Sequence, residues 1–391
     1  MADRDCRQKY SADQAAQDEC WMAQALELAQ GAARRTWPNP PVGALVVRDG
    51  EVVGRGAHQG AGTLHAEPVA LSEAGDQAKG ATLYVTLEPC NHQGRTAPCA
   101  PAVYASGVTR VVLANRDPNP TVIGGGCRHL RDRGVEVVCG VRAAEALEMI
   151  WPFVVTDNFS RPYVELKTAH SLDGFFAPLP STRQEAAPVY LTGAEARLDV
   201  HRRRRRVDLV VVGKGTVAAD RPVLDGRLAN AMPDVPQAEP TAAYVDTNLS
   251  WSEGFRRDKY IVFAGASARA ASTRAAIEAD GGQIIFCGEK AGRVDPSDLV
   301  VQAAAAGYLS LMVEGGPTLA GSFLQSSAID RWLRYQAPVI LGAGVGWPKG
   351  FLTDGRIDRN FHLTSASPLG ADLVTVHDRR KFSDVLARVT L

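Results

Sequence analysis

Hydrophobic residues along the chain alternate between short unbroken runs and stretches with helical spacing. The runs at 44–47, 81–87 and 108–114 have the length and the β-branched content of buried strands. Apolar residues at about 18–33 recur with helical spacing, which predicts a helix, whereas the polar residues 1–17 are expected to be frayed. Because strands and helices keep alternating up to about residue 150, the pattern predicts an α/β/α sandwich for the first half.

Weaker sequence signals predict the remaining strands and helices of the first half. Asp49-Gly50 predicts a turn that joins the strand at 44–47 to another at 51–55. A helix is expected to begin at His65 and another at Cys99, so both residues would lie at helix N-termini, which favour thiolate over thiol. The remaining elements are expected at 65–74 (helix), 99–106 (helix), 127–133 (helix), 135–138 (strand) and 143–149 (helix).

The second half alternates in the same way. Its clearest feature is a strand at 309–314 that runs into Gly315-Gly316-Pro317-Thr318, with a helix expected from Leu319. Such a layout can hold a phosphate because free backbone N–H groups point at it, although a plain tight turn is the alternative. Further strands are expected at 163–167, 209–212, 261–263 and 284–286, with a helix at about 267–279.

The two halves are expected to be separate domains. Trp151-Pro152 and Arg161-Pro162 interrupt regular structure, which predicts an irregular crossing at 150–162. The length of 391 residues also exceeds that of one ordinary domain. We therefore expect domains at 1–155 and 156–391.

Composition narrows the class of protein. The 43 basic and 43 acidic residues cancel, which argues against a broad surface for nucleic acid. No apolar run reaches the roughly 18 residues that a membrane span needs, and the N-terminus lacks the apolar core of a secretion signal. Five of the seven cysteines are scattered without paired spacing, as expected in a reducing compartment. We expect a cytoplasmic protein without nucleic-acid or membrane partners.

The stretch 65–99 carries the clearest chemistry. His65, Cys90 and Cys99 supply one imidazole and two thiols, a three-ligand set for zinc that leaves the fourth position open for a water. Zinc brings the pKa of such a water near neutrality, and Glu67 is close enough in sequence to serve as its proton shuttle. A His-x-Glu alone more often begins a surface helix, and two cysteines alone are weak evidence. Their order, and the proline before each cysteine, predict the zinc deaminase arrangement.

One departure from the general deaminase pattern is informative. That pattern has two residues between the cysteines, whereas Cys90 and Cys99 are separated by eight. The sequence Pro-Cys-Asn-His-Gln-Gly-Arg-Thr-Ala-Pro-Cys resembles the deaminase half of the bifunctional riboflavin-biosynthesis deaminase–reductase family. The Pro-Asn-Pro-Pro-Val-Gly loop at 38–43 and the Asp-Pro-Asn-Pro turn at 117–120 are similar to motifs of the same family.

This resemblance covers roughly residues 18–150 and implies a cytidine-deaminase-like domain. It assigns His65, Cys90 and Cys99 to zinc and Glu67 to proton transfer. It also implies that Asn39, His92 and Arg95 contact the substrate. Asn39 stands in a stiff loop suited to an amide that binds a flat heterocycle, although a turn-forming asparagine between prolines is equally compatible with the residues. Arg95 suits a phosphate, which a guanidinium can bind through two hydrogen bonds.

The second half resembles the reductase half of the same family, which has a dihydrofolate-reductase-like α/β fold and uses NADPH. The motifs are at 167–174, 213–217, 220–224 and 313–319. The resemblance implies cofactor contacts from Thr216, Asp220, Gly316, Pro317, Thr318, Leu319, Ala320, Gly321 and Ser322. It implies substrate contacts from Arg204, Leu224, Arg227 and Glu314.

Two segments differ from the family pattern. The segment 175–192 lacks the serine and tryptophan expected there, and Arg221 replaces an aspartate. The run Arg202–Arg206 points to all sides of its expected helix, so most of it is expected to be a solvated face, with Arg204 alone at the family's phosphate-contacting position.

The resemblance implies a two-domain, often oligomeric enzyme. Zinc-dependent deamination of 2,5-diamino-6-ribosylamino-4(3H)-pyrimidinone 5′-phosphate would precede NADPH-dependent reduction of the ribosyl to the ribityl side chain. We expect a homodimer or larger assembly. Because of the departures, a specialised paralogue with an altered reductase in flavin-like or azapteridine metabolism is the alternative. A nucleic-acid-associated use of the deaminase domain is a third, which salt-dependent affinity for RNA or DNA would support.

Overall fold

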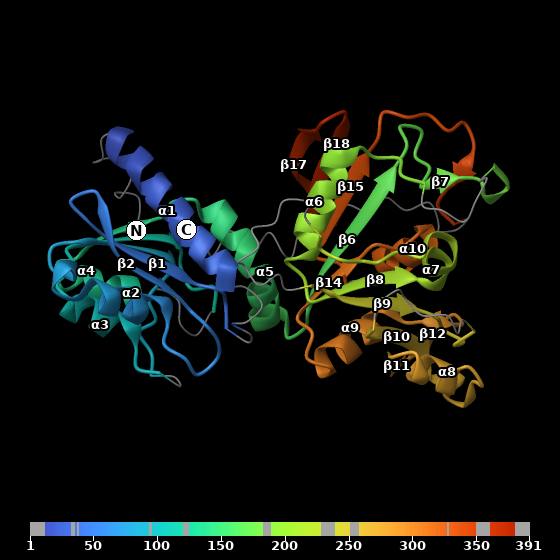
Figure 1. Cartoon of the computed structure of the whole chain (residues 1–391), viewed down its shortest axis with the longest axis horizontal. Helices are drawn as coiled ribbons and strands as arrows, with labels where there is room; N and C mark the ends of the chain where they lie inside the picture. The colour runs from blue at the N-terminus through green and yellow to red at the C-terminus, as the bar shows by residue number, and fades with distance from the viewer. Residues whose placement is uncertain are drawn as a thin grey trace. The chain divides into compact units, whose positions relative to one another are not determined.

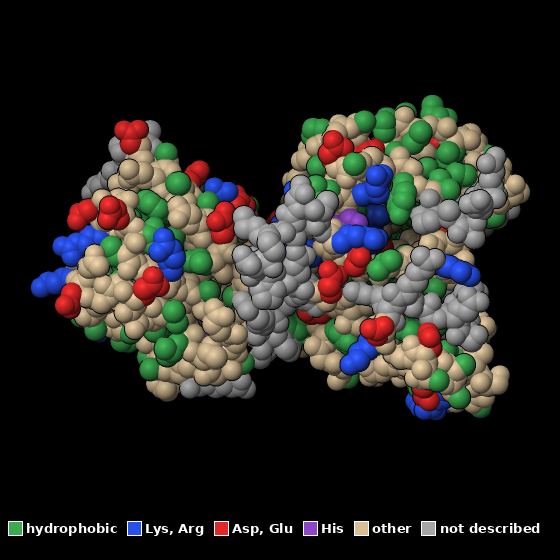
Figure 2. Space-filling view, in the orientation of Figure 1, with side chains coloured by type: hydrophobic (Ala, Val, Ile, Leu, Met, Phe, Trp, Pro, Cys, Tyr) green, Lys and Arg blue, Asp and Glu red, His purple; other side chains and the backbone are tan. Residues whose placement is uncertain are grey.

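A computed structural model shows two units, of which the first holds the described residues up to Phe159 and the second those from Ser160 on (Figure 1). The structure describes residues 12–32, 36, 39–93, 96–119, 125–182, 189–227, 239–250, 258–326, 328–348 and 360–379. Lys/Arg and Asp/Glu side chains are interspersed over the visible face in Figure 2. Among the described residues, no helix is long and apolar enough to cross a membrane.

The first unit is built on a sheet whose described strands follow the order β2-β1-β3-β4-β5. The strand β1 is antiparallel to both of its neighbours, β2 and β3, whereas β3, β4 and β5 are parallel, so the carboxyl ends of these three meet at one edge. The strands are β1 (Gly43–Arg48), β2 (Glu51–Ala57), β3 (Thr82–Leu87), β4 (Arg110–Asn115) and β5 (Glu136–Cys139).

Helices cover both faces of this sheet, as predicted. One face packs on α2 (Ala66–Ala74), α3 (Cys99–Ala105) and α4 (Gly125–Arg131), through small residues such as Ala70. The other face packs on α1 (Ala12–Ala32) and α5 (Ala143–Phe159). A short 3-10 helix, η1 (Gly75–Ala78), follows α2.

A glycine sets how closely α2 approaches the sheet. A Cβ on Gly56 of β2 would lie 2.1 Å from the Ala66 carbonyl oxygen, well inside van der Waals contact. Only a glycine therefore lets the first turn of α2 lie against β2. Since His65 and Glu67 flank Ala66, this contact also fixes the position of the expected zinc site.

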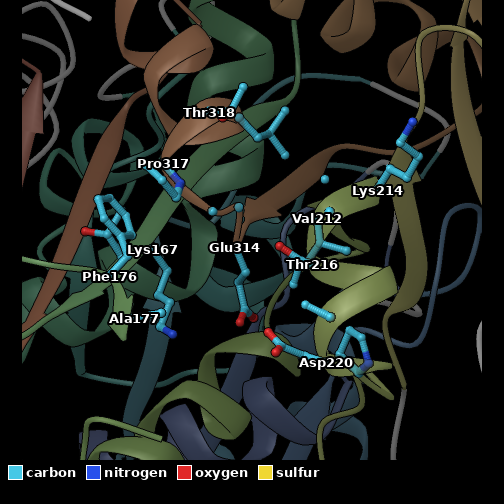
Figure 3. A pocket seen from close by; sticks show the side chains of 18 of the residues that line it. Lys167, Phe176, Ala177, Val212, Lys214, Thr216, Asp220, Glu314, Pro317 and Thr318 are labelled. Atoms are coloured by element: carbon cyan, nitrogen blue, oxygen red, sulfur yellow. The ribbon is translucent and has the colours of Figure 1, made fainter. Parts of the chain in front are cut away.

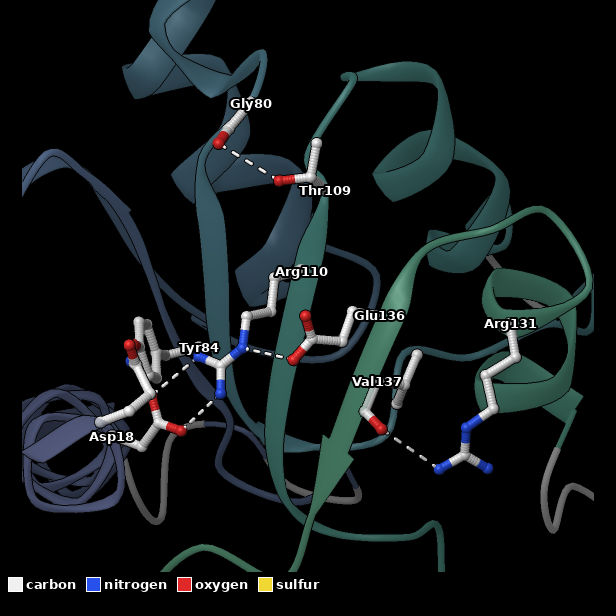
Figure 4. A network of polar contacts seen from close by, with 9 residues as sticks. Asp18, Gly80, Tyr84, Thr109, Arg110, Arg131, Glu136 and Val137 are labelled. Atoms are coloured by element: carbon white, nitrogen blue, oxygen red, sulfur yellow. Dashed lines mark hydrogen bonds and ion pairs between the residues drawn. The ribbon is translucent and has the colours of Figure 1, made fainter. Parts of the chain in front are cut away.

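The helix α1 begins earlier than the sequence predicts. Residues 1–17 were expected to be frayed, but α1 begins at Ala12. Asp18 explains the difference: its carboxylate accepts hydrogen bonds from Arg110 at 2.6 and 2.8 Å and from the Tyr84 hydroxyl at 2.8 Å (Figure 4). These partners on β3 and β4 stabilise the first turns of a helix whose own sequence is polar.

Proline does not end α5 where the sequence predicts. The expected helix at 143–149 continues through Pro152 to Phe159, and no irregular crossing follows it. Ile150, Trp151 and Val154 are buried on α5, so tertiary packing outweighs the backbone hydrogen bond that Pro152 cannot donate.

The second unit contains a sheet whose described strands follow the order β11-β10-β9-β8-β14-β6-β15-β18-β17. Neighbouring strands from β11 to β15 are parallel, and the last two strands form an antiparallel edge. The strands are β6 (Tyr163–His170), β8 (Leu209–Gly213), β9 (Thr241–Val245), β10 (Tyr260–Gly265), β11 (Gly282–Cys287), β14 (Ser310–Val313), β15 (Arg331–Gln336), β17 (Phe361–Leu369) and β18 (Asp372–Arg379).

Helices again cover both faces. The helices α6 (Ala194–Arg204), α7 (Lys214–Asp220) and α8 (Arg274–Ala279) pack on one face, and α9 (Pro296–Ala305) and α10 (Pro317–Gln325) pack on the other. Two two-stranded pairs, β7 (Ala177–Pro178) with β16 (Gly344–Val345) and β12 (Glu289–Lys290) with β13 (Arg293–Val294), and a 3-10 turn η2 (Pro180–Thr182) lie outside the main sheet.

The expected helix at 267–279 is two shorter elements. The 3-10 helix η3 (Ala266–Ala270) ends at Ala271, whose backbone is extended, and α8 begins at Arg274. The Thr273 hydroxyl between them donates a hydrogen bond to the Leu249 carbonyl, which draws the chain away from one continuous helix.

The chain passes from α5 to β6 within three residues. Arg161 donates two hydrogen bonds to the buried Asp330 carboxylate, at 2.6 and 2.8 Å. Asp330 also accepts from the Val164 backbone at 2.9 Å. The first residues of the second unit are therefore bound to Asp330 of the same unit.

Candidate active sites

His65, Cys90 and Cys99 converge in the first unit, as the sequence predicts. The Cys90 and Cys99 sulfurs lie 3.6 and 3.2 Å from His65 Nδ1, and one ligand atom from each of the three residues lies within 4.8 Å of the others. His65 is the N-cap of α2, Cys99 is the first residue of α3, and Cys90 follows the end of β3. Two helix N-termini and one strand end therefore bring the donors together.

The donor atoms fit zinc. Tetrahedral zinc with Zn–N near 2.0 Å and Zn–S near 2.3 Å would separate its ligand atoms by about 3.6 Å. The Cys99 backbone N–H also donates to Cys90 Sγ at 3.4 Å. Hydrogen bonds from Cys99 and His65 lower the pKa of Cys90 to about 4 against the opposing effect of burial. Cys90 is thus prepared as a thiolate, the form that binds metal.

Glu67 lies beside these ligands on the wall of a cavity of about 340 Å³. Its side chain is buried, and burial raises the pKa of Glu67 to about 7. A carboxyl group with such a pKa can accept and return a proton near neutral pH. The cavity is lined by Asn39, Pro40, Val42, His58, Gly62, Thr63, His65, Glu67, Leu87, Glu88, Cys90, His92, Thr96, Asp117, Asn119 and Phe153.

The structure reveals His58 as a neighbour of Asn39 that sequence reasoning missed. Asn39 Nδ2 lies 2.9 Å from His58 Nε2, and His58 Nδ1 lies 3.0 Å from the Leu64 carbonyl oxygen. A carbonyl can only accept, so Nδ1 carries the ring proton and Nε2 accepts from the Asn39 amide. His58 follows β2 and belongs to no motif, so its role had no signal in the sequence.

Other expected contacts of the first site have different outcomes. His92 is exposed and lines the cavity, whereas Arg95 lies outside the described residues. Asp117 and Asn119, from the Asp-Pro-Asn-Pro turn, also line the cavity. Burial is the main cause that raises the pKa of Asp117 to about 6.

The second unit holds a larger cavity, of about 1450 Å³, above the carboxyl ends of β6, β8, β9 and β14 (Figure 3). Ligands of open parallel sheets bind at this edge. Most residues that the sequence assigns to the reductase site line it: Arg204, Thr216, Asp220, Leu224, Arg227, Glu314, Gly316, Pro317, Thr318, Leu319 and Ser322. Ala320 and Gly321 do not; they are buried on the core side of α10, since a helix cannot turn seven successive residues to one cavity.

Arg204 and Glu314 form an ion pair within this cavity. Arg204 Nε and one terminal nitrogen donate to the two Glu314 oxygens at 2.6 and 2.9 Å, and its other terminal nitrogen donates to the Asp225 carbonyl at 3.1 Å. Burial raises the pKa of Glu314, but Arg204 and then Lys167 outweigh it, so the pKa lies below its usual value. Lys167, which sequence reasoning left without a role, therefore belongs to this charged centre.

The arginine run is less solvated than predicted. Arg203 and Arg204 have side-chain exposures of 15 and 13%, and Arg203 pairs with Asp199 at 2.8 Å. Arg205 is half-buried, and Arg202 and Arg206 are exposed. The expectation that most of the run is a solvated face is therefore wrong, because Arg203 faces Asp199 and Glu165 and Arg204 pairs with Glu314.

The N-terminus of α10 faces the same cavity. Gly316 is the N-cap and no side chain caps the helix. A Cβ on Gly315 would lie 2.7 Å from the Leu319 side chain, so the Gly-Gly turn lets the chain enter the helix closely. The uncapped N–H groups and the cavity's size fit a phosphate-bearing cofactor such as NADPH.

The two places where the sequence differs from the family pattern contribute unequally to the cavity lining. Arg221 is exposed, ends α7 with a φ of 42°, and is not part of the cavity lining, whereas its neighbours Asp220 and Pro222 are. Phe176, Ala177 and Tyr190 from the altered segment do line the cavity. Pro180, Val189, Leu191 and Thr192 of the same segment line it as well, whereas residues 183–188 lie outside the described residues.

Comparisons with known proteins match each half of the chain to a family model. Residues 15–115 match the model of the cytidine and deoxycytidylate deaminase zinc-binding region, and residues 162–375 match that of the RibD C-terminal domain. The chain is 36% identical over 344 residues to the riboflavin biosynthesis protein RibD of Escherichia coli, covering 84% of this chain and 89% of that protein. It belongs to the RibD family.

Solved structures are similar over nearly the whole chain. Acinetobacter baumannii RibD superposes with a TM-score of 0.72 at 32% identity, covering 93% of this chain and 99% of that one. A Thermotoga maritima deaminase–reductase gives 0.72 at 29% identity, covering 94 and 99%. As a member of this family, the chain is therefore an enzyme of riboflavin biosynthesis with a deaminase half and a reductase half, and its cofactors are zinc and NADPH. The predicted fold class is confirmed, and the specialised paralogue is not favoured.

Proposed function

We propose that the chain deaminates 2,5-diamino-6-ribosylamino-4(3H)-pyrimidinone 5′-phosphate and then reduces the ribosyl chain of the product. The observation that carries the proposal is the convergence of His65, Cys90 and Cys99 beside buried Glu67 in one cavity. The printed activities of the Thermotoga maritima relative, a diaminohydroxyphosphoribosylaminopyrimidine deaminase and a 5-amino-6-(5-phosphoribosylamino)uracil reductase, support the choice of substrate.

In the deaminase half, His65, Cys90 and Cys99 would hold zinc, which when bound would supply a water that ionises near neutral pH. Glu67 would move one proton of this water to the ring nitrogen beside C2 as the oxygen bonds to C2. It would then move the second proton, from the hydroxyl on C2, to the amino group, so that the C2–N bond breaks, ammonia leaves and the carbonyl forms. Glu67 lines the cavity and its side chain is buried, so bulk water has little access to the carboxylate that carries the proton.

We propose that Asn39 orients the pyrimidine. Its Nδ2 is used by His58, which leaves Oδ1 to accept an N–H from the ring or its amino groups. His92 on the cavity wall and Arg95 are proposed to contact the ribose phosphate, since both side chains can carry the complementary charge.

In the reductase half, bound NADPH would supply a hydride to C1 of the ribose, opened as an imine whose nitrogen takes up a proton. We propose that Thr216, Asp220 and the residues 316–322 hold the cofactor, through side chains where they line the cavity and through backbone N–H groups at the start of α10. Arg204, Leu224, Arg227 and Glu314 are proposed to hold the substrate. The two hydrogen bonds from Arg204 fix the orientation of the Glu314 carboxylate at the substrate end of the cavity.

Incubation with the diamino-pyrimidinone phosphate, with and without NADPH, tests the proposal when products are followed by mass. We expect the deaminated ribosyl product without NADPH and the ribityl product with it. Glu67→Gln should slow ammonia release about 10²- to 10⁴-fold with zinc content unchanged. Glu73→Gln, an exposed residue on the same helix, is the matched control. No turnover of this substrate by the wild-type enzyme would refute the proposal.

The domain boundaries, the oligomeric state and the cellular location are also proposals. We propose that the domains are 1–155 and 156–391, which the division after Phe159 supports to within a few residues. We propose a homodimer or larger assembly, tested by light scattering of the purified chain. We also propose a cytoplasmic location, since the described cysteines are free thiols, and fractionation of cells would test it.

A further inference from the structure

The far end of the reductase cavity carries a lysine that the reaction itself does not use. Lys214 lines the cavity, and Figure 3 shows it and Lys167 on opposite sides of Glu314. Lys214 is the first residue of α7 and follows β8 directly. The substrate centre is thus at one end, and Lys214 at the other.

Lys214 is held by an acidic residue at the end of the next strand. Its Nζ lies 3.4 Å from Asp246 Oδ1 and donates to Ser250 Oγ at 2.6 Å. Asp246 follows β9, is 3% exposed and lines the same cavity. The Ser250 backbone N–H and hydroxyl also donate to Asp246, at 2.7 and 3.2 Å.

This arrangement bears on the choice between NADPH and NADH. An acidic residue near the end of the second strand of a nucleotide-binding sheet commonly accepts hydrogen bonds from the ribose of NADH, and its charge opposes a 2′-phosphate. Here Lys214 and Ser250 already occupy the Asp246 oxygens, and Lys214 offsets the charge. The lysine side chain is 40% exposed and has a third N–H to donate.

We propose that Lys214, positioned by Asp246 and Ser250, binds the 2′-phosphate of the cofactor and so determines the preference for NADPH over NADH. This inference rests on the proposed reductase function. Arg293 lines the same cavity, but it is an exposed residue of the short β13, and no charged partner positions it among the described contacts.

Binding of NADPH and NADH to the full zinc-loaded chain tests the assignment, with affinities measured by calorimetry. Lys214→Met should weaken NADPH binding about tenfold to a hundredfold, the loss expected for one charge-assisted hydrogen bond, and leave NADH binding unchanged. Unchanged NADH binding also shows that the site is folded. Lys214→Arg should restore most of the preference.

Two further variants sharpen the test. Asp246→Asn removes the opposing charge and should raise the ratio of NADPH to NADH affinity, opposite in sign to Lys214→Met. Lys259→Met, an exposed lysine before β10, is the matched control and should leave the ratio unchanged.

The outcomes separate this assignment from the proposed function. A wild-type chain that binds NADPH, with the same ratio in Lys214→Met, would overturn the Lys214 assignment alone. Loss of the preference in Arg293→Met but not in Lys214→Met would overturn it as well. A wild-type chain that binds neither nucleotide would overturn the reductase function and this assignment with it.

Discussion

The two cavities balance their charges in different ways. In the first unit, His65, Cys90 and Cys99 form a donor set with a lowered Cys90 pKa, and a cation from outside completes it. In the second unit, Glu314 is balanced within the protein by Arg204 and Lys167. The first site therefore depends on a metal, and the second depends on its own side chains.

This difference also determines whether a substitution reduces activity or stability. Loss of a zinc ligand removes the metal from the first site, and with it the activation of the water. A missing member of the charged centre leaves buried charges without a partner in the second, and such charges destabilise the fold. The two halves should accordingly fail in separable ways.

The largest expected effect comes from the metal. Cys90→Ser, or chelation of the wild-type enzyme, should abolish zinc binding and slow deamination about a thousandfold or more, since several kcal/mol of stabilisation are lost. NADPH-dependent reduction of an already deaminated substrate should persist. Metal analysis and the two separate assays measure this.

The matched control for the metal experiment is Cys287→Ser, which alters a buried thiol of the second unit. It should retain zinc and deamination. Loss of both activities in Cys90→Ser would contradict the independence of the halves.

Next in size is the charged centre. Glu314→Gln should destabilise the second unit by about 3–5 kcal/mol, because it leaves Arg204 and Lys167 facing each other in a buried site. Arg204→Met should cost less, since Lys167 still balances Glu314. Denaturant unfolding followed by NADPH binding measures the loss, with deamination as the control activity. Equal costs for the two variants would argue against the role of Lys167.

A smaller effect is expected at the start of α1. Burial raises the pKa of Asp18, but hydrogen bonds from Arg110 and Tyr84 and the charge of Arg110 outweigh it, so the pKa is below its ordinary value. The stabilisation is therefore present above the unfolded pKa of about 3.9 and is lost as pH falls through the lower folded value.

Asp18→Asn should accordingly cost about 2 kcal/mol at pH 7, the size of a charged hydrogen bond. The difference from wild type should vanish as the pH falls below the folded pKa. Unfolding free energies measured from pH 7 down to about pH 2 check this. A difference independent of pH would show that shape, not charge, holds α1.

The smallest effect is expected on the arginine run. Arg202→Ala should change the free energy of unfolding by less than about 0.5 kcal/mol, because Arg202 is exposed. Arg203→Met should cost clearly more, since Arg203 pairs with Asp199. Thermal unfolding of the two variants side by side provides the measurement, and equal losses would refute the burial of one side of α6.

How well the sequence predicts a contact depends on how far apart the two residues lie along the chain. The zinc donors lie within 35 positions and share a spacing that few other structures need, so the sequence alone located them. The partnership of Asn39 and His58 has no motif, and no spacing signals it.

Long-range partners explain the remaining errors. Residues 12–17 look like part of a polar, frayed segment until Asp18, at the expected start of the helix, meets Tyr84 and Arg110. Arg203 meets Glu165 of the distant strand β6 at 3.9 Å, a partner that the run of arginines does not reveal, so most of the run looks like a solvated surface in the sequence. Local pattern gave the helices and strands, whereas these contacts depend on how the sheets assemble.

The short passage between the units has a consequence for anyone who wishes to separate them. A protease needs several residues of extended, accessible chain, and the chain from Phe159 to Tyr163 offers few, because Arg161 and the start of β6 are bound to Asp330. Digestion should therefore spare this junction. Obtaining either half alone therefore requires expression from a truncated gene. The boundary should keep Arg161 in the same fragment as Asp330.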